Sequence, residues 1–167
     1  MADEANSTVA LFAASFDPVT RGHLDLIQRA LNIFDEVVVA VATNVDKRGG
    51  TFSIEERVDM LRQVLREEPR VRVEILSGLV VRHAEKIGAR AIIRGLRAMS
   101  DFEYEFEMAL MNKHLNPNVE ILFMMTSQKY LFVSSSRLKE LVQFGIDIEE
   151  FVPGVVAKRL CEKLGRR

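Results

Sequence analysis

The stretch Ala10-Leu-Phe-Ala-Ala-Ser-Phe-Asp-Pro-Val-Thr-Arg-Gly-His23 decides the fold. It opens with an apolar run typical of a buried strand, breaks at Asp17-Pro18, and resumes as a helix near Gly22 and His23. The N-terminus of a helix presents unpaired backbone N–H groups and about half a positive charge. The stretch therefore predicts a phosphate-binding turn between a strand and a helix.

The composition sets the broad class of the protein. The chain has 167 residues, 48% of them hydrophobic, and its 23 basic and 24 acidic side chains give a net charge of −1. This length suits one domain with a real core, and the balanced charge argues against a general nucleic-acid or membrane-surface binder. The single Cys161 excludes an internal disulfide and fits a cytoplasmic location, and no apolar run is long enough to span a membrane. We expect the polar residues 1–7 to form a flexible tail and residues 8–167 to form a single domain.

Apolar segments of strand length alternate with segments of helical periodicity along the chain. We expect strands at residues 8–13, 37–42, 71–76, 91–94 and 119–125. We expect helices at residues 22–34, from the capping box Ser53-Ile-Glu-Glu56 onward, at 79–87, from the capping box Ser100-Asp-Phe-Glu103 to about His114, at 135–144, and at 153–164. The pattern predicts an α/β fold: one Rossmann-like domain with a doubly wound, five-stranded parallel sheet, helices on both faces and a C-terminal helical segment.

Two of these segments carry further information. Residues 71–76 alternate between apolar and polar side chains, which places this strand at the edge of the sheet. Residues 100–114 admit two interpretations, because Phe102, Tyr104 and Phe106 also alternate as in a strand. The capping box and the later Leu110 favour a helix.

Ligands of doubly wound sheets bind beyond the carboxyl ends of the strands. Polar segments follow four of the expected strands: Ser15–His23, residues 44–47, Arg94–Arg97 and the serine run Ser134-Ser135-Ser136. These segments are far apart in the sequence, yet the topology brings them to one rim. We expect them to form a single site.

His23 at the start of a helix can donate a hydrogen bond to a phosphate oxygen, while Gly22 lets the backbone approach closely. The alternative is a histidine that only caps its helix or faces water. Thr20 is the expected N-cap residue, and Phe16 is expected to pack inward from the turn.

The basic residues of the rim can grip phosphate oxygens. Lys47 lies in a charged loop, which is either a solvated run of charges or a mobile cation that reaches an anionic substrate. Arg94 and Arg97 offer two guanidinium groups three positions apart, and the alternative is structural salt bridges with Glu103 or Glu105. The serine run precedes a helix and can hold a phosphate, or it can simply supply an N-cap.

These residues resemble known motifs. Thr20-Arg-Gly-His23 resembles the T/H-x-G-H signature of the nucleotidyltransferase superfamily, and Val133-Ser-Ser-Ser136, followed by Lys139, resembles its second signature. From about Thr8 to Leu164 the chain is similar to the bacterial phosphopantetheine adenylyltransferase family. The similarity includes the segments Ser15–Pro18, Phe52–Val58, Ile93–Ala98, Asp101–Glu105 and Asn112–Leu115.

The resemblance implies an Mg²⁺-dependent enzyme that joins ATP and 4′-phosphopantetheine into dephospho-coenzyme A and pyrophosphate. It implies ATP contacts at Ser15, Phe16, His23, Gly95, Leu96, Arg97, Glu105, Tyr130, Leu131, Phe132, Val133, Ser134, Ser135 and Ser136. It implies phosphopantetheine contacts at Ser15, Lys47, Leu79, Val80, Arg94 and Asn112. It also implies a homohexamer, with coenzyme A as a feedback inhibitor.

The acceptor phosphate is already anionic, so the expected mechanism is a direct in-line attack on the α-phosphorus of ATP, without a covalent enzyme intermediate. His23 would stabilise the transition state, assisted by Lys47 and Arg97. We expect no metal ligand from the protein, since the phosphates of ATP and water would hold Mg²⁺.

Two other functions remain open at this stage. One is a nucleotidyltransferase with a different acceptor, such as nicotinamide mononucleotide or a phospho-alcohol, which Lys47, Leu79-Val80 and Asn112 would have to exclude. The other is a non-catalytic nucleotide or coenzyme A sensor, which is favoured by Ala13-Ala14 where the family has Pro-Gly. A P-loop kinase is disfavoured, because the sequence has no Gly-x-x-x-x-Gly-Lys-Ser/Thr motif.

Overall fold

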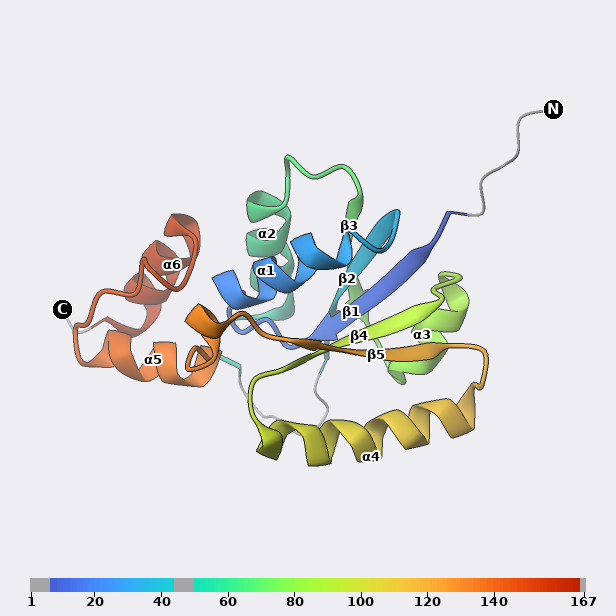
Figure 1. The fold of residues 1–167 in the computed structure, drawn as a ribbon. Helices are drawn as coiled ribbons and strands as arrows, with labels where there is room; N and C mark the ends of the chain where they lie inside the picture. Colours follow the sequence, from blue (N-terminus) through green and yellow to red (C-terminus); the bar gives the residue numbers. More distant parts are fainter. Residues whose placement is uncertain (1–6, 44–49, 166–167) are drawn as a thin grey trace.

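The computed structural model describes residues 7–43 and 50–165, which centre on one parallel sheet (Figure 1). Its strands are β1 (Val9–Ala14), β2 (Glu36–Ala42), β3 (Val71–Leu76), β4 (Ala91–Leu96) and β5 (Glu120–Met125). The strand order is β3-β2-β1-β4-β5, and all four pairings are parallel. The predicted doubly wound, five-stranded sheet is therefore confirmed, with β3 at an edge as its alternating pattern indicated.

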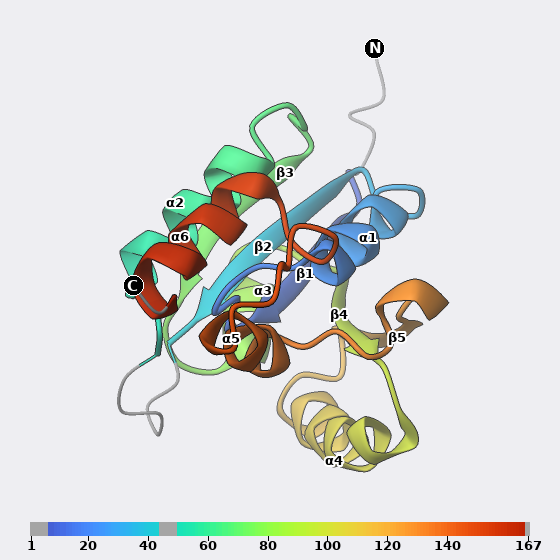
Figure 2. The same cartoon turned by 90° about the vertical axis from the view of Figure 1, so that its left-hand side faces the viewer.

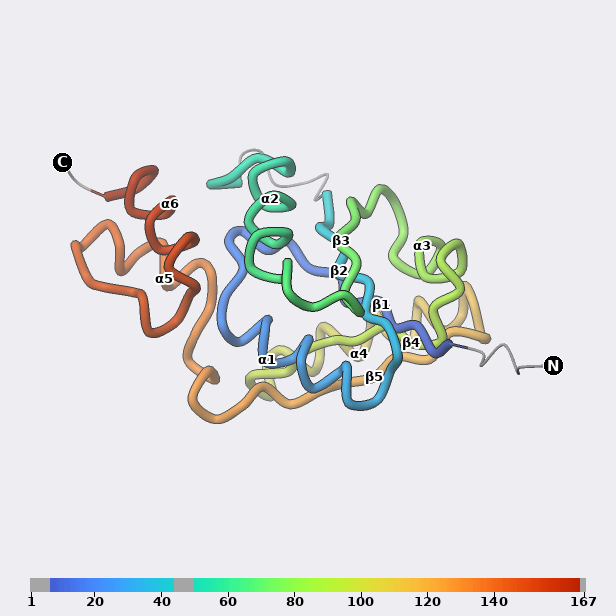
Figure 3. The backbone as a smooth tube through the Cα atoms, turned by 90° about the horizontal axis from the view of Figure 1, so that it is seen from above, coloured from blue at the N-terminus to red at the C-terminus, as the bar shows by residue number. Residues whose placement is uncertain are grey.

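Helices cover both faces of this sheet (Figure 1). They are α1 (Arg21–Ala30), α2 (Ile54–Val64), α3 (Val80–Lys86), α4 (Met99–Leu115), α5 (Ser135–Gln143) and α6 (Gly154–Leu164), with a short 3-10 turn η1 (Gln128–Tyr130) before α5. The pair α1 and α2 lies on one face, and α3 and α4 lie on the other. The last two helices lie beyond the carboxyl end of β1 (Figure 3), and α6 packs along α2 (Figure 2).

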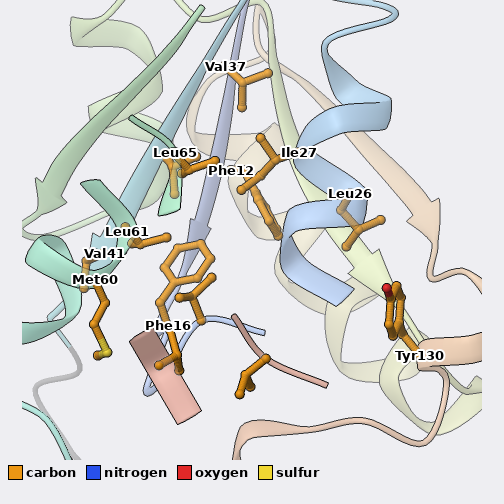
Figure 4. Close-up of a cluster of buried hydrophobic side chains, with 14 of the residues drawn as sticks. Phe12, Phe16, Leu26, Ile27, Val37, Val41, Met60, Leu61, Leu65 and Tyr130 are labelled. Carbon is orange, nitrogen blue, oxygen red and sulfur yellow. The ribbon is translucent and has the colours of Figure 1, made fainter. Parts of the chain in front are cut away.

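The side chains of β1 alternate between two core layers. Phe12 joins the larger layer beneath α1 and α2, where Figure 4 shows its ring beside Ile27 of α1. Leu11 and Ala13 join the smaller layer beneath α3. Because β1 is buried on both faces, its carboxyl end is held firmly, and this end carries the turn that leads to His23.

The structure corrects two predicted helix boundaries. The first helix ends at Ala30 rather than at Phe34. The capping box predicted at Ser100–Glu103 is wrong: α4 already begins at Met99, and its N-cap residue, Ala98, offers no side-chain hydrogen bond. Instead, the Asp101 carboxylate accepts from the backbone N–H of Arg97 at 3.2 Å. The capping box at Ser53 and Glu56 is confirmed, as is the helical interpretation of residues 100–114.

Gly95 in β4 leaves room for α1. A Cβ atom at this position would lie 2.6 Å from Cδ1 of Leu26. We expect Gly95→Ala to lower the free energy of unfolding by about 1–3 kcal/mol through overpacking, measured by urea denaturation. Gly154→Ala is the matched control, because a Cβ atom there meets nothing within 4 Å. Equal stability of the two variants would contradict this assignment.

Candidate active site

A hollow of about 300 Å³ opens at the carboxyl edge of β1 and β4. It brings together most of the residues predicted for ATP: Ser15, His23, Gly95, Arg97, Glu105, Tyr130, Val133, Ser134, Ser135 and Ser136, together with Arg94. These residues come from the β1–α1 turn, β4, α4 and the start of α5. The convergence of three of the four predicted segments on one rim is thus confirmed, while residues 44–47 lie outside the described part of the chain.

Phe16 supports this hollow from beneath. Its backbone has a φ of 44°, and it is the only non-glycine residue with a positive φ in the described part of the chain. The ring is 1% exposed and packs edge-on against Phe12 and His23, with centroid distances of 5.6 and 5.1 Å. The prediction of inward packing is confirmed, and Phe16 is not among the side chains that line the hollow.

The two alanines before Ser15 fit this backbone without strain. Ala13 and Ala14 both line the hollow, and neither has the left-handed backbone that would favour glycine. The carbonyl oxygen of Ala13 accepts a hydrogen bond from Nη1 of Arg94 at 2.8 Å. Alanine at these positions therefore removes no conformation that the turn requires.

The start of α1 fixes the orientation of His23. Thr20 is the N-cap, and its Oγ1 accepts from the backbone N–H of His23 while the backbone N–H of Thr20 donates to Nδ1 of His23 at 3.0 Å. Because Nδ1 accepts a hydrogen bond, the proton of the neutral ring resides on Nε2. Burial, together with the nearby Arg97 guanidinium, lowers the pKa of His23 from 6.5 to about 4. His23 is therefore a neutral donor, and the predicted N-cap role of Thr20 is confirmed.

This pKa predicts how the protein responds to acid. The unfolded chain binds a proton on His23 below pH 6.5, whereas the folded protein does so only near pH 4. Acidification through this interval therefore favours the unfolded chain, so we expect stability to be lost as the pH falls from 6.5 towards 4. NMR titration of the ring and denaturation at several pH values measure both effects. The variant His23→Asn should lose less stability than the parent protein between pH 6.5 and pH 4. A His23 ring that titrates near pH 6.5 in the folded protein would contradict the lowered pKa.

Arg94 forms a fork-to-fork ion pair with Glu105. Its Nε and Nη2 donate to the two carboxylate oxygens at 2.6 Å each. The carboxylate side chain of Glu105 is only 13% exposed, against 30% for Arg94. One of the two salt bridges considered for Arg94 is therefore present, and both groups still line the hollow.

A second cavity of about 80 Å³ lies against the same ion pair. It brings together three residues predicted for phosphopantetheine: Val80, Arg94 and Asn112. The other lining side chains, which the sequence did not single out, are mostly apolar: Ile92, Tyr104, Met108, Ala109 and Ile121. Leu79 lies in neither cavity and is 55% exposed, and Lys47 lies outside the described residues.

Arg97 is held at the opposite side of the hollow. Its Nε donates to Asp101 at 3.2 Å, and its Nη1 reaches the carbonyl oxygen of Val133 at 3.5 Å. The guanidinium therefore lies beside the serine run. In this run Ser134 is the N-cap of α5, as the alternative for the serine run predicted, because its Oγ accepts from the backbone N–H of Arg137.

Besides Phe16, three further residues that were predicted to contact ATP do not line the hollow. Leu96 is buried in the sheet, while Leu131 and Phe132 are 38% and 56% exposed. Conversely, the hollow includes Thr126, which the prediction missed although it directly follows β5. The rule that ligands lie beyond the carboxyl ends of strands could have identified it.

Asp17 is a further residue that the prediction missed. It is 8% exposed, and its carboxylate accepts from the backbone N–H groups of Thr51 and Phe52 at 3.0 and 2.9 Å. Burial opposes its ionisation, but these N–H groups and the ammonium group of Lys139 lower the pKa of Asp17 below its ordinary value. Asp17 is therefore an ionised, buried carboxylate next to the hollow.

Two absences hold for residues 7–43 and 50–165. Within these ranges no group of three or more His, Cys, Asp or Glu side chains could hold a metal ion. Within the same ranges no helix is long and apolar enough to cross a membrane.

The lining of the hollow suits phosphate groups. Two helix N-termini, those of α1 and α5, face one hollow with a neutral imidazole donor and two guanidinium groups at its walls. The carboxyl edge of a doubly wound sheet is the usual ligand site of this fold class, and the polar lining of the hollow suits a nucleotide.

Comparisons with known proteins identify the family. The model of the cytidylyltransferase-like family matches residues 11–141. The chain is 55% identical over 155 residues to the phosphopantetheine adenylyltransferase of Caldanaerobacter subterraneus subsp. tengcongensis, covering 93% of this chain and 96% of that protein. It is also 55% identical over 159 residues to the phosphopantetheine adenylyltransferase of Desulforudis audaxviator, covering 95% and 97%. The chain therefore belongs to the phosphopantetheine adenylyltransferases within the cytidylyltransferase-like family.

Solved structures agree with the fold. A bifunctional NMN adenylyltransferase/ADP ribose pyrophosphatase from Francisella tularensis superposes with a TM-score of 0.70 at 15% identity. The match covers 93% of this chain and 49% of that one. This likeness concerns the fold alone.

Proposed function

We propose that the protein transfers the adenylyl group of ATP to 4′-phosphopantetheine, giving dephospho-coenzyme A and pyrophosphate in a reversible step of coenzyme A synthesis. The observation that carries this proposal is the pair of cavities that meet at Arg94. The larger cavity is polar and faces two helix N-termini, which suits a nucleotide triphosphate. The smaller one is mostly apolar and includes Asn112 in its lining, which suits a thin chain with an amide group.

In this arrangement the phosphate of the acceptor lies at Arg94, next to the α-phosphate of ATP. The acceptor phosphate is anionic at neutral pH, so it attacks the α-phosphorus in line without a general base, and pyrophosphate leaves. His23 donates from Nε2 to the α-phosphate as charge develops there. Arg97 and the serine run hold the β- and γ-phosphates. Lys47, which is assigned from the sequence alone, orients the acceptor.

Mg²⁺ enters as part of the MgATP substrate in this proposal. The carboxylates beside the hollow are already engaged: Glu105 by Arg94, Asp101 by Arg97, and Asp17 by Lys139 and Arg57. The described residues therefore fit an ion that is held by the phosphates of ATP and by water. Mg²⁺ supplies charge neutralisation of these phosphates.

A single incubation tests the function. The protein is mixed with ATP, Mg²⁺ and 4′-phosphopantetheine, and the products are identified by mass. We expect dephospho-coenzyme A and pyrophosphate. Parallel incubations with nicotinamide mononucleotide or a phospho-alcohol should release no pyrophosphate, and turnover with one of these instead would assign a different acceptor. ATP binding without turnover would make the protein a sensor.

We also propose that six copies assemble, with their contacts on α4. Several large apolar side chains of this helix are exposed: Tyr104 by 65%, Leu110 by 57% and Met111 by 55%. Exposed apolar patches of this kind mark interaction surfaces. Native mass spectrometry should give six times the mass of the chain.

We further propose a cytoplasmic location, where ATP is available, and inhibition by coenzyme A, which would share the two cavities with the substrates.

A further inference from the structure

Two side-chain contacts join the start of α5 to the β1–α1 turn. Ser135 Oγ of α5 donates to the carbonyl oxygen of Pro18 in the β1–α1 turn at 2.8 Å. Lys139, one turn further along α5, donates from Nζ to Oδ2 of Asp17 at 3.0 Å. The distance between the α1 side and the α5 side of the hollow therefore depends on this pair of contacts.

Of these two contacts, the ion pair of Lys139 with Asp17 belongs to the larger network of hydrogen bonds. Its Oδ1 lies 3.4 Å from Nε of Arg57, and Nη1 of Arg57 in turn donates to the carbonyl oxygen of Ser15 at 3.3 Å. Together with the N–H groups of Thr51 and Phe52, these contacts tie the β1–α1 turn to the start of α2 as well as to α5. The Asp17 and Arg57 side chains are only 11% and 9% exposed.

Such an arrangement is costly to build. A buried carboxylate needs several donors before it is stable, and an apolar side chain would fill the same space without them. Asp17 does not line the hollow, but together with Lys139 it lines an adjoining cavity of about 730 Å³ that also includes Ser135. The carboxylate is therefore next to the hollow and makes no contact inside it. What the carboxylate does supply is a fixed spacing between elements that carry His23 and the serine run.

We propose that Asp17 is a positioning residue for adenylyl transfer, which acts by holding Lys139 of α5 against the β1–α1 turn. This inference rests on the proposed function. Loss of the ion pair between Asp17 and Lys139 lets the serine run move away from His23. The serine run and the His23 ring then no longer contact the phosphates of one bound ATP at the same time. A displacement of about 1 Å in such a site costs up to about 100-fold in rate.

The test is a double-mutant cycle with Asp17→Asn, Lys139→Met and the double variant, assayed below the Tm of each protein. We expect each single variant to lower kcat by about 10- to 100-fold. We expect the double variant to lose no more than the worse single variant, because the two residues act as a unit. Lys139→Arg keeps the charge and should retain most of the kcat.

Asp59→Asn is the matched control, since it removes the ion pair of Asp59 with Arg159 between α2 and α6, away from the hollow. It should leave kcat unchanged and lower the Tm only slightly, because the Asp59 side chain is 52% exposed. A kcat of Asp17→Asn within twofold of the parent protein overturns the proposal. A double variant whose kcat falls by the product of the two single losses also overturns it. So does a fall in kcat with Lys139→Met but not with Asp17→Asn, which would assign Lys139 a direct phosphate contact.

Two further readouts keep the test decisive. If Asp17→Asn does not fold, the comparison of Lys139→Met with Lys139→Arg remains, and equal activity of these two overturns the proposal. If the parent protein makes no dephospho-coenzyme A, the proposed function fails, and calorimetric titration with ATP then tests the inference separately. Weaker ATP binding by Asp17→Asn than by Asp59→Asn supports it, and equal binding overturns it.

Discussion

Replacement of His23 by alanine is expected to lower kcat for dephospho-coenzyme A formation by about 10²–10³-fold. The reason is the loss of the Nε2 donor, because a single preorganised donor to a developing charge is worth this much in rate. The fold should survive, since the change removes one half of a capping box, which costs about 1 kcal/mol. Steady-state kinetics and a thermal melt measure the two effects.

His23→Asn separates the two roles of the ring. An asparagine oxygen can accept from the backbone N–H of Thr20 in place of Nδ1, while nothing replaces the Nε2 donor. This variant should melt close to the parent protein and still lose the rate. Near-normal turnover in either variant would remove His23 from the mechanism.

Arg94→Ala is expected to have the largest combined effect on stability and activity. It leaves the Glu105 carboxylate, which is 13% exposed, without its partner, and the carbonyl oxygen of Ala13 without its donor. We expect a loss of about 3 kcal/mol in the free energy of unfolding, the lower end of the range for breaking a buried pair. We also expect a large rise in KM for 4′-phosphopantetheine, because the guanidinium that receives its phosphate is gone. Chemical denaturation and initial rates measure these changes.

The double variant Arg94→Ala/Glu105→Gln distinguishes the structural cost from the functional one. With no charge left unpaired, it should regain most of the lost stability. It should not regain activity, since no cation remains at this place between the two cavities. Recovery of turnover in the double variant would show that Arg94 only neutralises Glu105.

Much of the fold was predictable because its signals are local. The apolar runs and the capping box at Ser53 and Glu56 depend on neighbours within a few residues, and the structure confirms them. The capping box predicted at Ser100 and Glu103 is wrong, because local spacing alone does not show which side chain caps the helix. The adjacent Asp101 accepts from the backbone N–H of Arg97 instead.

The site was predictable only as far as topology reaches. The rule for carboxyl ends gathered His23, Arg94, Arg97 and the serine run correctly. It could not decide whether Arg94 pairs with Glu105, because a guanidinium and a carboxylate 11 positions apart suit both a salt bridge and a ligand site. Asp17 escaped notice because its partners lie 34 to 122 positions away, where no periodicity connects them.

The left-handed backbone of Phe16 narrows the choice of amino acid at this position. Glycine and asparagine adopt such a φ readily, but neither fills the buried space that the ring occupies beside His23. Valine and isoleucine are excluded by their branched Cβ atoms. Ring burial, worth about 3–5 kcal/mol for phenylalanine, outweighs a backbone cost of about 1–3 kcal/mol. We therefore expect position 16 to accept aromatic side chains with the smallest loss of stability.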